Sequence, residues 1–208
     1  SKKKNIDSTI YYSNLVAKNA FNLKGFTKKR EVLLEINLLK TRAAINNPKN
    51  IEIHKDYLKN CISFIRILKD YGDYDLGIKT TYQAKKIVEQ IANKTNDLEL
   101  FKIQNSIYYF LINYNITSNN LNAAIKNSYE FISILDEHIK KDKSNTELIL
   151  DKMLLNQFLS AQLSAIGDTL NSKKCDSIHV TLFKDNNKKF RSFPNYESGL
   201  LDYHSNGN

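Results

Sequence analysis

The histidines and cysteines are the residues of this chain best suited to catalysis or metal binding, and their spacing favours neither. The four histidines are His54, His138, His179 and His204, and none forms a ligand pair at helical spacing with another. Cys61 and Cys175 are also far apart, and we interpret them as buried thiols of a reducing compartment, since free cysteine behaves as a small hydrophobic residue. The sequence therefore predicts a cytoplasmic protein without catalytic residues, a metal site or a cofactor.

The charge of the chain raises nucleic-acid binding as one alternative. Formal net charge is +9, with 31 Lys and Arg against 22 Asp and Glu. Basic clusters that could neutralise phosphates occur at 2–4, 28–30, 140–143, 173–174 and 188–189. Arginine is scarce, however, and the abundance of Lys, Asn and Ile is typical of an AT-rich, bacterial genome. We therefore keep a basic nucleic-acid-binding helical protein only as an alternative function.

Most of the chain has the apolar periodicity of amphipathic helices. Apolar residues recur at steps of three and four in the segments 6–23, 27–44, 51–70, 73–92, 98–114, 121–140 and 147–166. In the second segment we expect Val32, Leu33, Ile36, Leu38 and Leu39 to form the buried stripe. Polar breakers at 46–50, 93–97 and 140–145 separate the helices into pairs.

A turn recurs within these pairs at a fixed distance. Gly25, Gly72, Asn119 and Gly167 follow one another at intervals of 47, 47 and 48 residues. A fixed period of this size is the signature of a repeat architecture. We therefore predict a helical-repeat domain over 1–170, with units of about 6–47, 48–94, 95–142 and 143–170.

The pattern fails after the last of these turns. Ile178–Phe183 is β-branched and alternating, and Lys189–Phe193 could pair back across a polar turn. We predict that 171–208 is a short β-hairpin or extended tail, either capping the last unit or beginning a further domain.

Paired antiparallel helices of this kind resemble the tetratricopeptide repeat. The best match is Gly72–Ala84, in which Gly77 and Ala84 occupy the positions where the family has small residues. Small side chains there let the second helix of one unit approach the first helix of the next. Ala124 matches the first small position of the third unit, whereas Phe131 departs from the second, and Arg30 departs in the first unit. The period also exceeds the usual length of about 34 residues. The resemblance implies an all-α superhelix of stacked helix pairs.

The resemblance also implies a concave groove, lined by the first helix of each unit, that binds an extended peptide. Transferred to this chain, the groove residues are Asn19, Asn22, Lys59, Ile62, Arg66, Lys69, Tyr109 and Asn113, with Leu15 and Ser106 as further candidates. Asn can donate to and accept from a peptide bond, and Lys or Arg can hold a carboxylate.

We therefore expect a protein- or peptide-binding interaction module, such as a scaffold or a regulatory or sensory domain of a bacterial signalling protein. A sensory domain with a small ligand between its helices is the second alternative to this function. Whether the chain forms a homodimer is left open by the sequence.

Overall fold

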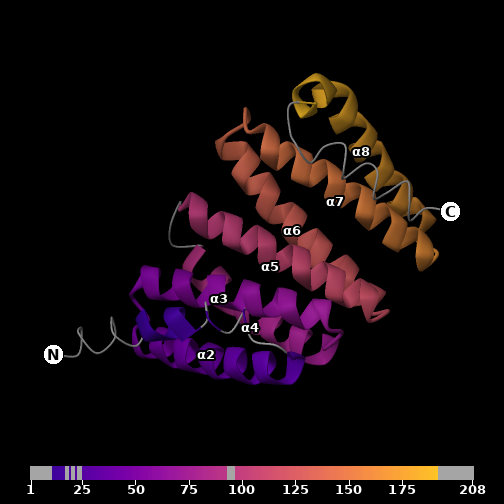
Figure 1. Cartoon of the computed structure of the whole chain (residues 1–208). Coiled ribbons are helices and arrows are strands. Elements are labelled where there is room, and N and C mark those ends of the chain that lie inside the picture. The colour runs from indigo at the N-terminus through magenta and orange to yellow at the C-terminus, as the bar shows by residue number, and fades with distance from the viewer. Residues whose placement is uncertain (1–10, 17–18, 20–21, 23–24, 93–96, 192–208) are drawn as a thin grey trace. The chain divides into compact units, whose positions relative to one another are not determined.

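The chain is all-α in the part that the structure describes. The computed structural model describes residues 11–16, 19, 22, 25–92 and 97–191, and this part contains helices and turns but no strand (Figure 1). Residues 11–16 and 19 are helical. The helices that follow are α2 (Phe26–Asn46), α3 (Ile51–Asp70), α4 (Tyr74–Ala92), α5 (Leu98–Thr117), α6 (Leu121–Lys141), α7 (Thr146–Ala165) and α8 (Thr169–Phe190). None of the described helices is long and apolar enough to span a membrane.

The turns at the predicted repeat positions share an unusual backbone conformation. Gly25, Gly72, Asn119 and Gly167 have φ angles of 92°, 76°, 56° and 83°, and no other described residue has a positive φ. Glycine and asparagine adopt this left-handed conformation most readily. The left-handed backbone conformation therefore recurs at the spacing found in the sequence, and this is compatible with a helical repeat.

Two of these turns close their helices with the same hydrogen bond. The N–H of Asp73 donates to the carbonyl of Leu68, and the N–H of Asp168 donates to the carbonyl of Leu163, both at 2.9 Å. Each bond spans the left-handed glycine, which is the arrangement of a Schellman C-cap. α3 and α7 therefore end alike, although their sequences differ.

The polar residues before the helices act as N-caps. The side chains that accept a backbone N–H three residues ahead are Asn50, Asp97, Asn120, Asn145 and Asp168. An N-cap of this kind stabilises a helix by about 1 kcal/mol. Part of the asparagine content of the chain thus serves to start helices.

The chain divides into two compact units, Ser1–Ser118 and Asn119–Asn208. In the first unit α3 is central: it packs against α2, α4 and α5, and α4 also packs against α5 (Figure 1). The main hydrophobic core of this unit contains Ile65 of α3, Val88 of α4 and Ile107 of α5. A second cluster joins Leu33 of α2 to Phe64 of α3.

Gly77 lies at the closest approach between two helices of this unit. A Cβ atom built on Gly77 of α4 would lie 2.3 Å from Cζ of Tyr114 on α5, which is far inside van der Waals contact. Ala84, the other small residue of the predicted motif, is fully buried. The structure therefore confirms that the second helix of one pair approaches the first helix of the next at this small residue.

The buried stripe of α2 differs from the predicted one. Leu33 and Ile36 are buried as expected, but Leu38 and Leu39 are 51% and 44% exposed. The buried face of α2 instead includes the polar residues Asn37 and Lys40. A prediction that selects only apolar residues therefore placed part of this face wrongly. Lys40 is neutralised by Asp56 of α3, its Nζ lying 3.0 Å from Oδ2.

In the second unit α7 packs between α6 and α8 (Figure 1). Leu159 and Leu163 of α7 meet Cys175 of α8, with Ile125 of α6 packed against them. Nearer the other end of α8, Phe190 is buried with Leu150 and Met153 of α7.

The predicted β-hairpin is wrong, because 169–190 forms the single helix α8. The rest of the predicted tail, 192–208, lies outside the described residues. Its contact side includes Cys175, His179, Leu182 and Phe190, at steps of four, three and eight. This is helical spacing, and it places apolar side chains against α7. The β-branched residues Ile178 and Val180 are exposed, so the alternation that indicated a strand lies largely on the outer side.

Candidate functional site

α3 and α5 run parallel to each other within the first unit. Near the start of α3, Nζ of Lys55 lies 2.5 Å from Oδ2 of Asp97 and 3.1 Å from Oε2 of Glu99, at the start of α5. Near their ends, the hydroxyl of Tyr114 donates to the carbonyl of Ile65 at 2.6 Å. The start of α3 thus contacts the start of α5, and the end of α3 contacts the end of α5. The two helices therefore point in the same direction.

One side of this helix pair carries two matching rows of side chains, which are joined where Lys59 of α3 contacts Glu99, one turn before the α5 row. The rows are Lys59, Ser63, Arg66 and Asp70 on α3, and Lys102, Ser106, Tyr109 and Asn113 on α5. Both are spaced by four, three and four residues, which keeps each row on one face of its helix. These side chains are exposed or half-buried, and we call the surface that they form the α3–α5 face.

The cations of this face differ in their availability. Lys59 is held by Glu99, with Nζ 2.5 Å from Oε1. Arg66 and Lys102 are exposed and form no ion pair with another described residue. Positive charge for a ligand is therefore best supplied by Arg66 and Lys102 rather than by Lys59.

The small polar side chains of the face are fixed by their own helices. The hydroxyls of Ser63 and Ser106 donate to the backbone carbonyls of Lys59 and Lys102, four residues earlier. The side-chain amide of Asn113 donates in the same way to the backbone carbonyl of Tyr109. Each side chain keeps oxygen lone pairs that can accept a further hydrogen bond. They are positioned acceptors for N–H groups that approach this surface.

Tyr109 adds an aromatic surface between these polar groups. Its side chain is 53% exposed, and its ring meets that of Phe110 edge-on, with the centroids 5.8 Å apart. A tyrosine held in this way offers both an apolar ring and a hydroxyl to a ligand.

The remaining predicted groove residues lie elsewhere or are only partly available. Ile62 packs against the main core, and Lys69 is half-buried in the last turn of α3. Asn19 and Asn22 are exposed in the N-terminal segment, as is Leu15. From that segment, the amide of Asn14 donates to Asp56 of α3 at 3.3 Å. Of the predicted groove residues, Lys59, Arg66, Tyr109 and Asn113 thus belong to the two rows of the α3–α5 face.

Sequence reasoning missed Ser63, Lys102 and Lys55. The first two could have been found by extending the same four–three spacing along each helix. Lys55 could not, because its role depends on acids at the start of α5, more than forty residues later.

Lys55 is the electrostatic link between the starts of α3 and α5. It bonds Asp97, Glu99 and Glu52, and these acids raise its pKa, Asp97 most strongly. In return Lys55 lowers the pKa of Asp97, and Lys59 followed by Lys55 lowers that of Glu99.

We expect Lys55→Met to destabilise the protein near neutral pH and to do so less in acid. Lowered carboxyl pKa values stabilise the fold above the ordinary values of 3.8 and 4.5, and this contribution is lost as the pH falls through the folded values. Because the pKa of Lys55 is raised above 10.5, Lys55 stays charged throughout this range, and the protonation of its carboxylate partners sets the pH dependence. Urea unfolding of native protein and variant at several pH values measures the difference.

Lys102→Met is the matched control for this prediction, because Lys102 is exposed and has no ion pair among the described residues. A destabilisation by Lys55→Met that is the same at neutral and acid pH would show that the carboxylates are not involved.

The cysteines have the properties of structural thiols. Cys61 is fully buried and its Sγ lies 3.2 Å from Oδ1 of Asn37, while burial raises its pKa to about 12. Burial also raises the pKa of Cys175. A nucleophilic cysteine needs a lowered pKa. The described residues contain no group of three His, Cys, Asp or Glu side chains placed to hold a metal ion.

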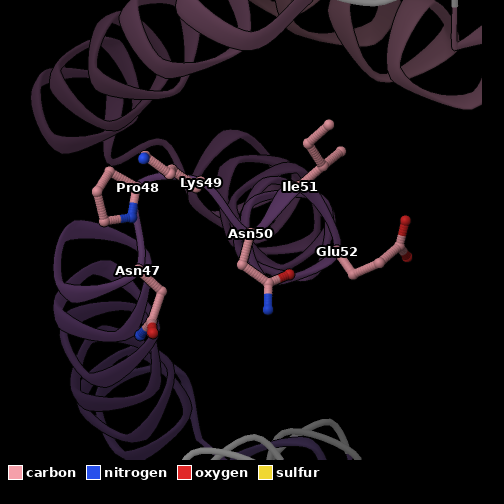
Figure 2. A pocket seen from close by; sticks show the side chains of 6 residues that line it. All are labelled: Asn47, Pro48, Lys49, Asn50, Ile51 and Glu52. Atoms are coloured by element: carbon pink, nitrogen blue, oxygen red, sulfur yellow. The ribbon is translucent and has the colours of Figure 1, made fainter.

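A surface pocket lies at the turn between α2 and α3. It is lined by Asn47, Pro48, Lys49, Asn50, Ile51 and Glu52, which are consecutive residues (Figure 2). Figure 2 shows their side chains diverging from the turn instead of converging on a common centre. Ligand sites are normally formed by groups that converge from several elements, so this pocket lacks the construction of one.

Comparison with known proteins adds no relative: no family model matches the chain, and no curated protein matches it. The class of protein is therefore defined by the structure alone, as an all-α chain whose neighbouring helices pack together within each of its two units, compatible with a helical repeat.

Proposed function

We propose that the chain is a tetratricopeptide-like interaction module that binds an extended peptide segment of a partner protein on the α3–α5 face. The observation that carries the proposal is the pair of parallel rows, in which Arg66 and Tyr109 are exposed beside fixed hydrogen-bond acceptors. An extended peptide presents backbone N–H groups, which suit the oxygens of Ser63, Ser106 and Asn113.

The distribution of charge supports a peptide over a nucleic acid. Asp70 lies in the α3 row, and Glu99 neutralises Lys59, so the face mixes both signs. Phosphate binding depends on cations that are not accompanied by acids. The pocket at the α2–α3 turn gives no support to the small-ligand alternative, because a single turn forms it.

The test is selection of binding peptides from a random peptide array with the native chain, followed by affinity measurement on the selected peptide. We expect Arg66→Ala and Tyr109→Ala each to weaken binding about tenfold, as truncation of Arg and Tyr anchors typically does. Fluorescence anisotropy with the labelled peptide measures the dissociation constants.

Lys86→Ala and Tyr82→Ala are matched controls, since both residues are exposed on α4. They should leave the affinity unchanged. Selected peptides that bind the Arg66→Ala, Tyr109→Ala double variant as well as the native chain would exclude the α3–α5 face, and so would an array without binders.

A further inference from the structure

α2 carries a second regular row of side chains on its exposed side, separate from the α3–α5 face. Glu31, Glu35, Leu38, Arg42 and Ile45 are spaced by four, three, four and three residues, and all are exposed. This is the spacing of the contact seam in a pair of helices that pack along their length. Leu38 is 51% exposed and Ile45 67% exposed, so the row has apolar side chains without a described cover.

The charges of this row are arranged unequally about its centre. The acids Glu31 and Glu35 precede Leu38, and the cation Arg42 follows it. Neither Glu35 nor Arg42 forms an ion pair with a described residue of its own chain. The row is thus acidic at one end and basic at the other, with both charges available to a partner.

A second copy of the same helix complements this row if it runs antiparallel. When Leu38 of one copy lies opposite Leu38 of the other, Glu35 of the first copy faces Arg42 of the second. Likewise, Arg42 of the first copy faces Glu35 of the second. Two such pairs form for each contact, as a two-fold axis requires. A parallel arrangement would instead place Glu35 opposite Glu35 and Arg42 opposite Arg42, which repel.

We propose that the protein forms a two-fold homodimer in which the exposed sides of the two α2 helices pack antiparallel about Leu38. The apolar side chains Leu38, Leu39 and Ile45 supply the surface that is removed from water. The Glu35–Arg42 pairs supply the direction and register. One helix from each copy buries less surface than a standard interface, so the dimer is a weak one. α2 lies at the edge of the first unit, packed on α3 on its other side (Figure 1).

The test uses charge reversal and sedimentation velocity over a wide range of protein concentrations. Native protein should change from monomer to dimer as its concentration rises. Glu35→Arg and Arg42→Glu, made separately, should each weaken dimerisation at least about tenfold, because each brings like charges together twice. The variant with both substitutions should dimerise as the native chain does.

A mixture of the two single variants gives the sharpest result. Glu35→Arg has two cations in the row and Arg42→Glu has only acids, so each opposes its own copy but complements the other. An equimolar mixture should therefore form heterodimers at concentrations where each variant alone is monomeric. Lys79→Glu, an exposed change on α4, is the control and should dimerise normally.

Three results would overturn the proposal. They are a native chain that stays monomeric at every concentration, single variants that dimerise like the native chain, and folded single variants whose mixture stays monomeric. Circular dichroism establishes that each variant is folded. Peptide binding at the α3–α5 face should be unchanged in all of them, so this proposal and the proposed function can fail separately.

Discussion

Phe190→Ala is expected to destabilise the second unit by about 3–5 kcal/mol, which is typical of removing a fully buried phenylalanine. Phe190 is the last residue of α8, and its side chain is completely buried against Leu150 and Met153 of α7. Truncation would leave a cavity at the point that fixes this end of α8. Urea unfolding followed by circular dichroism measures the loss.

Phe158→Ala is the matched control for this change. Phe158 belongs to α7 of the same unit but is 48% exposed, so its truncation should change stability by less than about 1 kcal/mol. Equal costs for the two variants would contradict the packing of α8 against α7. If this part of the chain were instead the hairpin or loose tail that its local sequence indicates, Phe190 would not pack against α7. The two variants would then lose the same small amount of stability.

The failure to predict α8 has a physical cause. Ile178–Phe183 has the composition of a strand, and strand propensity depends strongly on context. What decides the conformation is contact with α7, which needs Cys175, Leu182 and Phe190 on one side of a helix. Helical spacing is present in the sequence as well, but it becomes visible only when the polar residue His179, whose Nδ1 lies 3.1 Å from the carbonyl oxygen of Met153, is counted among the contacts.

The turns could be predicted because their cause is local. Gly72, Asn119 and Gly167 take a positive φ that few residue types tolerate, so residue type and spacing together identify them. Helix starts are equally local, since Asn50 and Asn145 cap the residues that directly follow. The tetratricopeptide resemblance rests on such features, and they support the order of helices rather than a superhelix.

The candidate site was only partly predictable because availability depends on distant neighbours. Lys59 and Arg66 look equivalent in the sequence and both are exposed, but Lys59 forms an ion pair with Glu99 of α5, whereas Arg66 forms none with a described residue. Ile62 has groove spacing, and yet it packs against the main core. The same limitation explains the wrong buried stripe of α2. Lys40 is buried because it forms an ion pair with Asp56 of α3, whereas Leu38 is exposed.

Gly77→Ala tests the closest approach in the first unit, and here two effects oppose each other. Alanine in place of glycine favours a helix by about 1 kcal/mol. Against this, the added Cβ would lie 2.3 Å from Cζ of Tyr114, and overpacking of this kind costs about 1–3 kcal/mol. The hydroxyl of Tyr114 is tied to the carbonyl of Ile65 in a buried hydrogen bond, so the ring cannot move aside freely. We therefore expect steric repulsion to dominate and Gly77→Ala to destabilise the protein.

The sign of this effect should reverse when Tyr114 is shortened. In a Tyr114→Leu background the ring atoms that meet position 77 are gone, so only the helix preference of alanine remains and Gly77→Ala should stabilise by up to about 1 kcal/mol. Urea unfolding of the four proteins in this double-mutant cycle gives the coupling energy, which should equal the steric cost of about 1–3 kcal/mol. An equal cost of Gly77→Ala in both backgrounds would mean that Tyr114 is not what requires glycine, because a defect confined to α4 would not depend on a residue of α5.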